Sequence, residues 1–439
     1  MKYPADGEIT AIHQKINLLL QTGQLLMESG ADTSRIIRNM NRTAAYMGIP
    51  QEKLTLHIMY TTLMVNIQDG PRFYTGFRKC QHHGINMTVI SALSKLSWRA
   101  MQNKYSLEKF AAALEEISHR PRFYSPWVTA IGAGFACGGF CKLFGSDWLA
   151  FLYTAICASL GFGLRRLCQR WGFNAYAGIA IAAFGATCLA FLTQYLPASA
   201  TPWHPLIACA LFIVPGIPLI NSIDDLLNNY IVSGSTRAMN TIIIVASMTF
   251  GIVIAIRLLH INDFTSLRII PDSIYISHAA AAAISAVGFS MIFNVPRRLL
   301  PAAAAGGVLS VCLRNLFALE MGMDQAAASF IGSAAVGILS LRAIHWFHTP
   351  NHVLAIPAVI PMIPGVLLYR LLFAIININN SDTADLIAGF RSGIEAMLIL
   401  AAIAVGIAIP NIFLSRYIER NRQLRQRELL AAHYSESDD

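Results

Sequence analysis

The fold is decided by residues 212–230, FIVPGIPLINSIDDLLNNY. An apolar helix is interrupted there by a Pro-Gly-x-Pro motif, and three polar side chains follow; the residues concerned are Pro215, Gly216, Pro218, Asn221, Asp224 and Asp225. Breaking a helix in lipid frees backbone N–H and C=O groups, which is tolerated only where protein or a water-filled cavity satisfies them. If the surrounding sequence spans a membrane, the break therefore indicates a protected interior.

The interruption recurs in residues 359–370, VIPMIPGVLLYR. Setting Pro215 on Pro364 brings Gly216 onto Gly365 and Asn221 onto Arg370. After a longer loop in the second copy, three more pairs match at one common spacing: Gly234 with Gly389, Asn240 with Glu395, and Gly251 with Gly406. We interpret the two stretches as one module that has been duplicated.

Composition places this module in a membrane. The chain has 439 residues, of which 55% are hydrophobic and 13% charged, and its mean hydropathy is +0.51. Several apolar runs after about residue 127 exceed the roughly 18 residues that suggest a spanning helix. The first apolar run, 16–27, is too short and too interrupted for a signal peptide, so we expect the N-terminal part in the cytosol. The formal charge of +9 is compatible with nucleic-acid binding, but the basic residues lie mostly between and after the apolar runs. We therefore expect no nucleic-acid partner.

Residues 1–125 have the polar and apolar alternation of a small cytosolic α+β domain. Helical spacing covers 9–27, a second helix capped by Asp32 or Thr33 runs to Tyr46, and helices return at 87–104 and 107–117. Between them, 54–68 is typical of one or two strands, with a turn at 69–71 and a partner strand at 73–77.

From residue 126 we expect ten spans in two halves, 126–265 and 266–415, followed by a cytosolic tail, 416–439. The expected spans lie near 127–144, 148–164, 173–196, 204–230, 237–259, 274–293, 301–318, 325–342, 352–377 and 391–414. Arginines gather in alternate connections and after the last span, which places both termini in the cytoplasm; Arg268, in the outer loop 260–272, is the exception. Five spans per half is an odd number, so the halves must be inverted, which is the pattern of secondary transporters.

Several motifs resemble the threonine/serine exporter family. They are the run LLLQTGQLLMESGADTSRIIRNMNRTAAYMGI (18–49) with Glu28–Ala31 and Arg35, the VPG of Val214–Gly216, Asp225, the SGSTR of Ser233–Arg237, and the IPG of Ile363–Gly365. The resemblance covers nearly the whole chain. It implies export of small amino acids such as threonine and serine across the bacterial inner membrane, driven by protons or the membrane potential. A close two-protein relative is associated with succinate export. Asp32, Tyr60-Thr61-Thr62 and Asn228-Asn229 depart from the family pattern, which leaves the substrate open between amino acids and dicarboxylates.

The candidate substrate-binding residues are Arg370, Asn221 and Asn240. The guanidinium of Arg370 can grip a carboxylate bidentately; the alternative is a salt bridge with Asp225 or Glu395. Each asparagine can instead make a helix-to-helix hydrogen bond.

The candidate proton or ion carriers are Asp225, Asp224 and Glu395, because a carboxylate within a span usually marks an ion path. The alternatives are helix ends at the water interface for the aspartates and an interfacial place near Arg391 for Glu395. The charge of Arg237 is explained by positive-inside placement, and Arg314 is expected to pair with Glu320.

No cofactor or metal is expected. Cys137 and Cys141 share a helix face but have no histidine or acid at ligand spacing. His345, His348 and His352 are spaced for a metal, but they follow Arg342 in a cytosolic connection, where a solvated histidine is the usual case. A hydrolase that uses Ser29, His57 and Asp69 is the rival function, although no nucleophile elbow surrounds Ser29; an open channel is the third. The expected partners are a small-molecule amino acid or carboxylate and the lipid bilayer. The sequence leaves the oligomeric state open, including a homo-oligomer.

Overall fold

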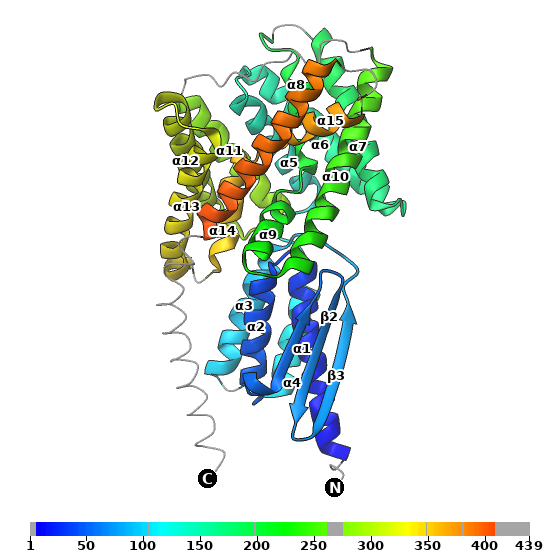
Figure 1. Cartoon of the computed structure of the whole chain (residues 1–439), viewed down its shortest axis with the longest axis vertical. Helices are drawn as coiled ribbons and strands as arrows, with labels where there is room; N and C mark the ends of the chain where they lie inside the picture. Colours follow the sequence, from blue (N-terminus) through cyan, green and yellow to red (C-terminus); the bar gives the residue numbers. More distant parts are fainter. Residues whose placement is uncertain are drawn as a thin grey trace. The chain divides into compact units, whose positions relative to one another are not determined.

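The structure is a computed structural model that describes residues 6–103, 105–196, 199–260, 275–347, 349–376, 378 and 382–408 (Figure 1). The described chain divides into two compact units: the first holds the residues up to Arg122 together with Asn221–Arg237, and the second holds Phe123–Ile220 and the described residues between Ala238 and Ala408. The predicted tail, 416–439, and almost all of the outer loop 260–272 lie outside the described residues. The limits predicted from sequence therefore stay predictions, and Asn221–Arg237 is an addition to the N-terminal unit.

The N-terminal part of the first unit, up to Arg122, is built from four α-helices and one antiparallel sheet. Its elements are α1 (Asp6–Glu28), α2 (Thr33–Tyr46), η1 (Gln51–Lys53), β1 (Leu54–Ile58), β2 (Thr62–Asp69), β3 (Arg72–Lys79), α3 (Met87–Gln102) and α4 (Leu107–Ser118). The strand order is β1-β2-β3, with Val65 opposite both Leu56 and Gly76. Buried and more exposed side chains alternate along β2, and α1 packs against β2 and β3. Gly76 allows this approach, because a Cβ there would lie 2.5 Å from Ile16 of α1.

Local signals in the sequence set these elements. Asp32 caps α2 by accepting a hydrogen bond from the Arg35 N–H at 2.7 Å, and Ser106 caps α4 in the same way. The strands predicted within 54–68 and 73–77, and the helices predicted at 87–104 and 107–117, are confirmed within a few residues.

The second unit consists of helices. They are α5 (Pro126–Leu143), α6 (Trp148–Arg170), α7 (Ala175–Leu192) with η2 (Thr193–Tyr195), α8 (His204–Ala208) with η3 (Leu211–Ile213), α9 (Gly216–Leu227), α10 (Ile231–Leu258), α11 (Tyr275–Ile292), η4 (Arg297–Leu299), α12 (Leu300–Asn315) with a π-helical turn η5 (Leu316–Glu320), α13 (Gln325–Phe347), α14 (Asn351–Val359) with η6 (Ile360–Met362), α15 (Gly365–Ile376) and a last helix, Thr383–Ala408. The division between the units falls inside α9 and α10.

Length and composition make this a multi-pass helical membrane protein. Six of the described helices are long and apolar enough to cross a membrane, and eight if each bent pair of helices counts as one span. Large apolar side chains remain exposed one turn apart, at Trp127, Ile131 and Phe135 on α5. Such a stripe suits lipid rather than water. The count of ten spans stays a prediction.

Several helices extend beyond the predicted spans: α10 begins at Ile231 rather than near 237, and the last helix begins at Thr383 rather than near 391. The span expected to end at residue 164 continues as α6 to Arg170, so Arg165 and Arg166 are helical rather than in a loop. No helix-breaking residue intervenes before Gly172, whose φ of +76° ends the helix.

The elements of the second unit recur at a fixed interval. Each of α11, η6 and α15 begins and ends 149 positions after α5, η3 and α9 respectively. Packing partners recur as well: α5 with α6, α6 with α7 and α6 with α8 reappear as α11 with α12, α12 with α13 and α12 with α14.

The crossing of α5 with α11 shows the same reciprocity at the level of single residues. A Cβ on Gly139 would lie 2.7 Å from both the Ala281 oxygen and Ser285 Cβ. At the position 149 residues later, a Cβ on Gly288 would lie 2.4 Å from the Gly132 oxygen and 2.6 Å from the Ala136 nitrogen. Glycine is therefore required at this crossing because the two backbones touch.

We expect Gly139→Ala to destabilise the protein by about 1–3 kcal/mol, because the added methyl group overpacks the crossing. Gly163→Ala on α6 is the matched control, since a Cβ there meets nothing within 4 Å. Alanine favours a helix over glycine, so the control should be neutral or slightly stabilising. Thermal unfolding of the purified variants in detergent measures both, and equal Tm values would contradict the close crossing.

Candidate functional site

Two interrupted helices face each other inside the second unit. The helix pairs His204–Ile213 with Gly216–Leu227 and Asn351–Met362 with Gly365–Ile375 bend by 59° and 63°. At each bend, the glycine N–H donates a hydrogen bond to the carbonyl two residues back, at 2.9 Å from Gly216 to Val214 and 2.8 Å from Gly365 to Ile363. The two breaks therefore satisfy one freed N–H in the same way.

The breaks pack reciprocally against each other. A Cβ on Gly216 would lie 2.6 Å from Ile363, and a Cβ on Gly365 would lie 3.1 Å from Val214. Val214 and Ile363 are themselves 149 positions apart, as Gly216 and Gly365 are. The apolar side chain that precedes each break therefore packs against the glycine of the other break.

A small apolar cavity of about 10 Å³ lies at this meeting point. Its lining is four pairs, each 149 positions apart: Phe140 with Phe289, Leu211 with Ile360, Val214 with Ile363, and Gly216 with Gly365. That volume is at the lower limit for one water molecule. A threonine therefore cannot occupy the space between the breaks in this conformation.

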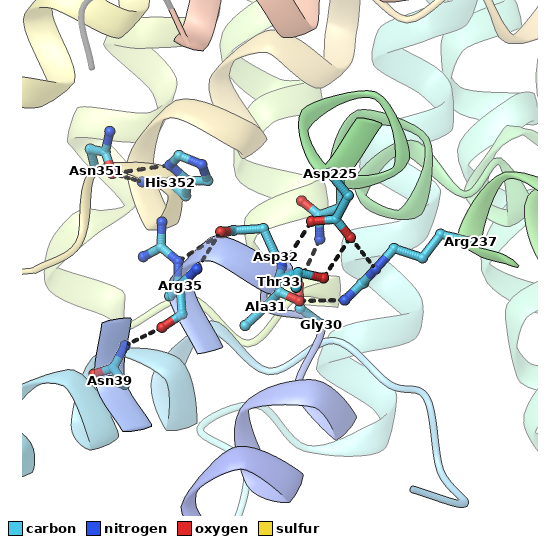
Figure 2. Close-up of polar contacts among 11 residues, drawn as sticks. Gly30, Ala31, Asp32, Thr33, Arg35, Asn39, Asp225, Arg237, Asn351 and His352 are labelled. Atoms are coloured by element: carbon cyan, nitrogen blue, oxygen red, sulfur yellow. Dashed lines mark hydrogen bonds and ion pairs between the residues drawn. The ribbon is translucent and has the colours of Figure 1, made fainter. Parts of the chain in front are cut away.

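In the first unit, the polar residues that follow the first break form a buried cluster with the start of α2 (Figure 2). The Thr33 N–H donates to one carboxylate oxygen of Asp225 at 2.9 Å, and the Thr33 hydroxyl donates to the other at 2.8 Å. Arg237 Nε lies 3.0 Å from the second oxygen. Asp225 is 0% exposed and Arg237 2%, so this ion pair is fully desolvated.

Arg237 also contacts the segment that precedes α2. It donates to the Ala31 carbonyl at 2.8 Å (Figure 2), and its guanidinium lies 5.1 Å from the centre of the Tyr60 ring. The sequence explained this arginine by membrane orientation alone. Its buried contacts give it a structural role as well.

The Tyr60 ring, which lies near the Arg237 guanidinium, is also stacked with the His83 ring; the two ring centroids are 3.9 Å apart. Burial and the positive charge of Arg237 lower the pKa of His83. The stacked imidazole is therefore held neutral beside the arginine.

Further hydrogen bonds form within α2 and between residues 221–237 and the N-terminal part of the unit. Arg35 Nε donates to Asp32 at 2.9 Å, and the Asn39 side chain donates to the Arg35 carbonyl at 2.9 Å (Figure 2). The Asn221 side chain donates to the Gly30 carbonyl at 2.9 Å, and the Ser233 hydroxyl donates to the Ile58 carbonyl at the same distance.

The predicted site residues after the first break are thus partly engaged with protein. Asn221 bonds to Gly30, Asp225 has three polar contacts, and Asp224 is half-buried beside it. Of the helix-break residues, Pro215 and Gly216 are buried, whereas Pro218 and Pro364 are half-buried. Their roles in binding and ion coupling stay predictions.

The predicted residues of the second unit lie on separate helices. Asn240 on α10 accepts a hydrogen bond from the Tyr176 hydroxyl at 2.7 Å. Arg370 is half-buried on α15, which packs against the last helix through Gly389 and Gly393. Glu395, on that last helix, is half-buried and makes no hydrogen bond or ion pair with any described residue.

Within the described part of the chain, the expected Arg314–Glu320 pairing does not form, and neither does the triad of the rival hydrolase function. Arg314 hydrogen-bonds to the neighbouring Asn315, while Glu320 accepts from the Tyr275 hydroxyl at 2.6 Å. The π-helical turn after Asn315 changes the phase of the helix between Arg314 and Glu320. No contact joins Ser29, His57 and Asp69; Asp69 instead lies 3.9 Å from Lys53.

Sequence reasoning missed Thr33 and Arg237 as the partners of Asp225. Asp32 and Thr33 were identified only as helix caps, and nothing local in the sequence links them to a residue 192 positions later. The SGSTR run of Ser233–Arg237, which follows Asp225 closely in the sequence, was the available signal for Arg237.

We expect Asp225→Ala to speed amide hydrogen exchange in the first turn of α2 by about tenfold or more, because Thr33 loses a charged acceptor. Peptides that cover 30–36 report this in the full-length protein, with α4 as the internal reference. The control Asp69→Ala, which removes an exposed ion pair, should leave the same peptides unchanged. Unaltered exchange in Asp225→Ala would show that the cluster does not hold this turn.

Two segments of the chain match sequence profiles of known protein families. Residues 17–259 match the sequence profile of a family described as "Putative threonine/serine exporter", and 278–413 match one described as "Threonine/Serine exporter, ThrE". A "Probable threonine/serine exporter" of Mycobacterium tuberculosis is 24% identical over 92% of this chain and 77% of its own length.

Two shorter relatives match as well. Proteins of Escherichia coli and Klebsiella aerogenes, each named "Probable succinate transporter subunit YjjP", are both 25% identical over 55% of this chain, which corresponds to 93% and 92% of their lengths. No solved structure matches the chain. The names of the matching relatives describe transporters. Because one family profile alone covers more than half of the sequence, this chain belongs to the threonine/serine exporter family.

Proposed function

We propose that the protein exports threonine and serine across the bacterial inner membrane by alternating access. The observation that carries the proposal is the reciprocal packing of the two broken helices around the small central cavity. Broken helices at matching places in two halves are typical of secondary transporters, whose substrate sites lie near the bilayer midplane. Family membership supplies the substrate class.

The two halves are inverted in this proposal, with both termini and the N-terminal α+β unit in the cytoplasm. Support comes from the fixed interval of 149 positions and from the reciprocal contacts at Gly139 and Gly288 and at Gly216 and Gly365. When residue i touches j and the equivalent of j touches the equivalent of i, a twofold axis relates them. Five spanning elements per half then require the axis to lie in the membrane plane.

Movement follows from the size of the cavity. A space of about 10 Å³ excludes every substrate under discussion. The residues before and after the two breaks must therefore separate when substrate passes. Rocking of one half against the other opens this place alternately to the cytosol and to the exterior.

Arg370 is the proposed anchor for the substrate carboxylate, with Asn240 as a neutral partner. Glu395 is the proposed proton carrier of the second half, because it is a half-buried carboxylate without a described partner. Protonation of Asp225, with Asp224 beside it, would break the ion pair with Arg237 and the grip on Thr33. Asn221 can offer the N–H that now bonds to Gly30 to a substrate only when it releases the Gly30 carbonyl.

Succinate is the second candidate substrate. The relatives named as probable succinate transporter subunits match 242 residues of this chain at 25% identity, about the same identity as the exporter relative. A dicarboxylate would use the same arginine chemistry.

Efflux from cells preloaded with labelled threonine, serine and succinate tests the function. We expect the intact protein to release threonine and serine faster than empty-vector cells, and Arg370→Gln to lose this release at matched membrane abundance. Arg391→Gln, which removes an exposed arginine, should behave as the intact protein. Release of succinate alone would replace the substrate, and release of none of the three would overturn the exporter.

A cross-link tests the movement. In a background without native cysteines, Val214→Cys with Gly365→Cys places two thiols across the breaks, where a Cβ on Gly365 lies 3.1 Å from the Val214 side chain. Oxidation should abolish efflux by the double variant and reductant should restore it, while oxidant should leave the efflux of each single-cysteine variant at its own untreated level. Full efflux with the disulfide formed would rule out separation at this point.

A further inference from the structure

The second unit contains two half-buried arginines at equivalent positions, Arg165 on α6 and Arg314 on α12. They are 149 positions apart, the interval that relates the two halves. Both lie in candidate membrane spans, Trp148–Arg170 and Arg297–Glu320. Each lies five or six residues before the end of its span, about 8–9 Å along the helix axis.

Each arginine lies one helical turn beyond a residue that touches a broken helix. On α6, a Cβ on Gly161 would lie 3.2 Å from the ring of Phe212, two residues before the first break. On α12, the equivalent residue Ser310 donates a hydrogen bond to the Ala358 carbonyl at 2.7 Å, shortly before the second break. Residues four apart share a helix face. Arg165 and Arg314 therefore continue the faces that contact the broken helices.

Neither guanidinium has a carboxylate partner among the residues that the structure describes. The Nε of Arg165 is buried without a hydrogen-bond acceptor there. Arg314 donates from Nε and Nη2 to a single amide oxygen, that of Asn315, at 3.2 and 3.0 Å. The Asn315 amide is in turn 3.0 Å from His278 Nδ1 and is nearly buried. An uncompensated cation within a span is costly and is retained where it binds something.

From this geometry we infer that Arg165 and Arg314 are two matched carboxylate-binding stations, one near each end of the substrate path. The inference rests on the proposed export of carboxylate-bearing molecules. With the halves inverted, α6 ends toward the cytosol and α12 ends toward the exterior, so Arg165 receives substrate on entry and Arg314 on exit. Threonine, serine and succinate share the group that a guanidinium fork grips in two places.

The test uses the full-length protein in oriented proteoliposomes, with threonine and succinate as the probes. Arg165→Gln should raise the half-saturating concentration on the cytosolic face by about tenfold or more, and Arg314→Gln should do so on the outer face. Arg165→Lys and Arg314→Lys keep the charge but lose the fork, so they should show smaller shifts in the same directions. Arg170→Gln and Arg391→Gln, which remove exposed arginines, are the matched controls.

Binding is measured separately, so that a failure of transport is informative. Threonine or succinate should raise the Tm of the intact protein, threoninol should not, and the Arg165→Gln/Arg314→Gln double variant should lose the shift. If the intact protein carries none of the probes yet keeps this shift, the exporter function fails and the arginine stations stand.

Three results would overturn the stations. The variants could match their controls in half-saturation and in Tm shift while the intact protein transports normally. The shifts could vanish when anionic lipid is replaced by phosphatidylcholine alone, which would assign the arginines to lipid phosphate. An intact protein that neither transports nor is stabilised by any probe would remove both proposals.

Discussion

The structure depends on the requirement that a helix broken within a membrane must surround its freed backbone groups with protein. Both breaks meet this requirement by the same means, a short 3₁₀ turn followed by a glycine whose N–H bonds two residues back. Each break then lies against the other, and the adjoining helices approach closely through glycines such as Gly139 and Gly288. The close packing leaves a cavity of about 10 Å³, so the contacts that protect the breaks would also close the proposed substrate path.

The Asp225–Arg237 pair imposes a different constraint, within the first unit. A buried ion pair seldom adds much net stability, because desolvation offsets the Coulomb attraction, but removal of one partner is strongly destabilising. Here the carboxylate also accepts two bonds from Thr33, and the guanidinium reaches the Ala31 carbonyl. The arrangement therefore selects one geometry for the start of α2 against the segment after the first break. Such selectivity suits a contact that has to form and release in a defined way.

The sequence predicted features that depend on local chemistry. The Pro-Gly breaks, the cap at Asp32, the strand turn before β3 and the apolar runs follow from residue type and spacing, and the structure has them. It did not predict the partners of Asp225, because a contact across 192 positions has no local signature. The length of α6 was underestimated because charged residues at its end suggested a loop, although arginine is compatible with helix. The expected pairing of Arg314 with Glu320 was wrong because the π-helical turn after Asn315 separates the two side chains.

Equivalent positions in the two halves fall into two groups: residues that pack the breaks are similar, and residues proposed for binding or coupling differ. Positions that pack the breaks kept similar residues in both halves, as with Leu211 and Ile360 or Gly216 and Gly365. Positions proposed for binding and coupling differ between the halves: when the two halves of the sequence are aligned, Asn221 corresponds to Arg370 and Asn240 corresponds to Glu395. A perfectly symmetric pair of halves would treat the two sides of the membrane alike. Divergence at Asn240 and Glu395 gives only one half a titratable group there, which is compatible with the proposed role of Glu395 as a proton carrier. Arg165 and Arg314 are the exception that kept the same charge, because a substrate carboxylate has to be received at both ends of the path.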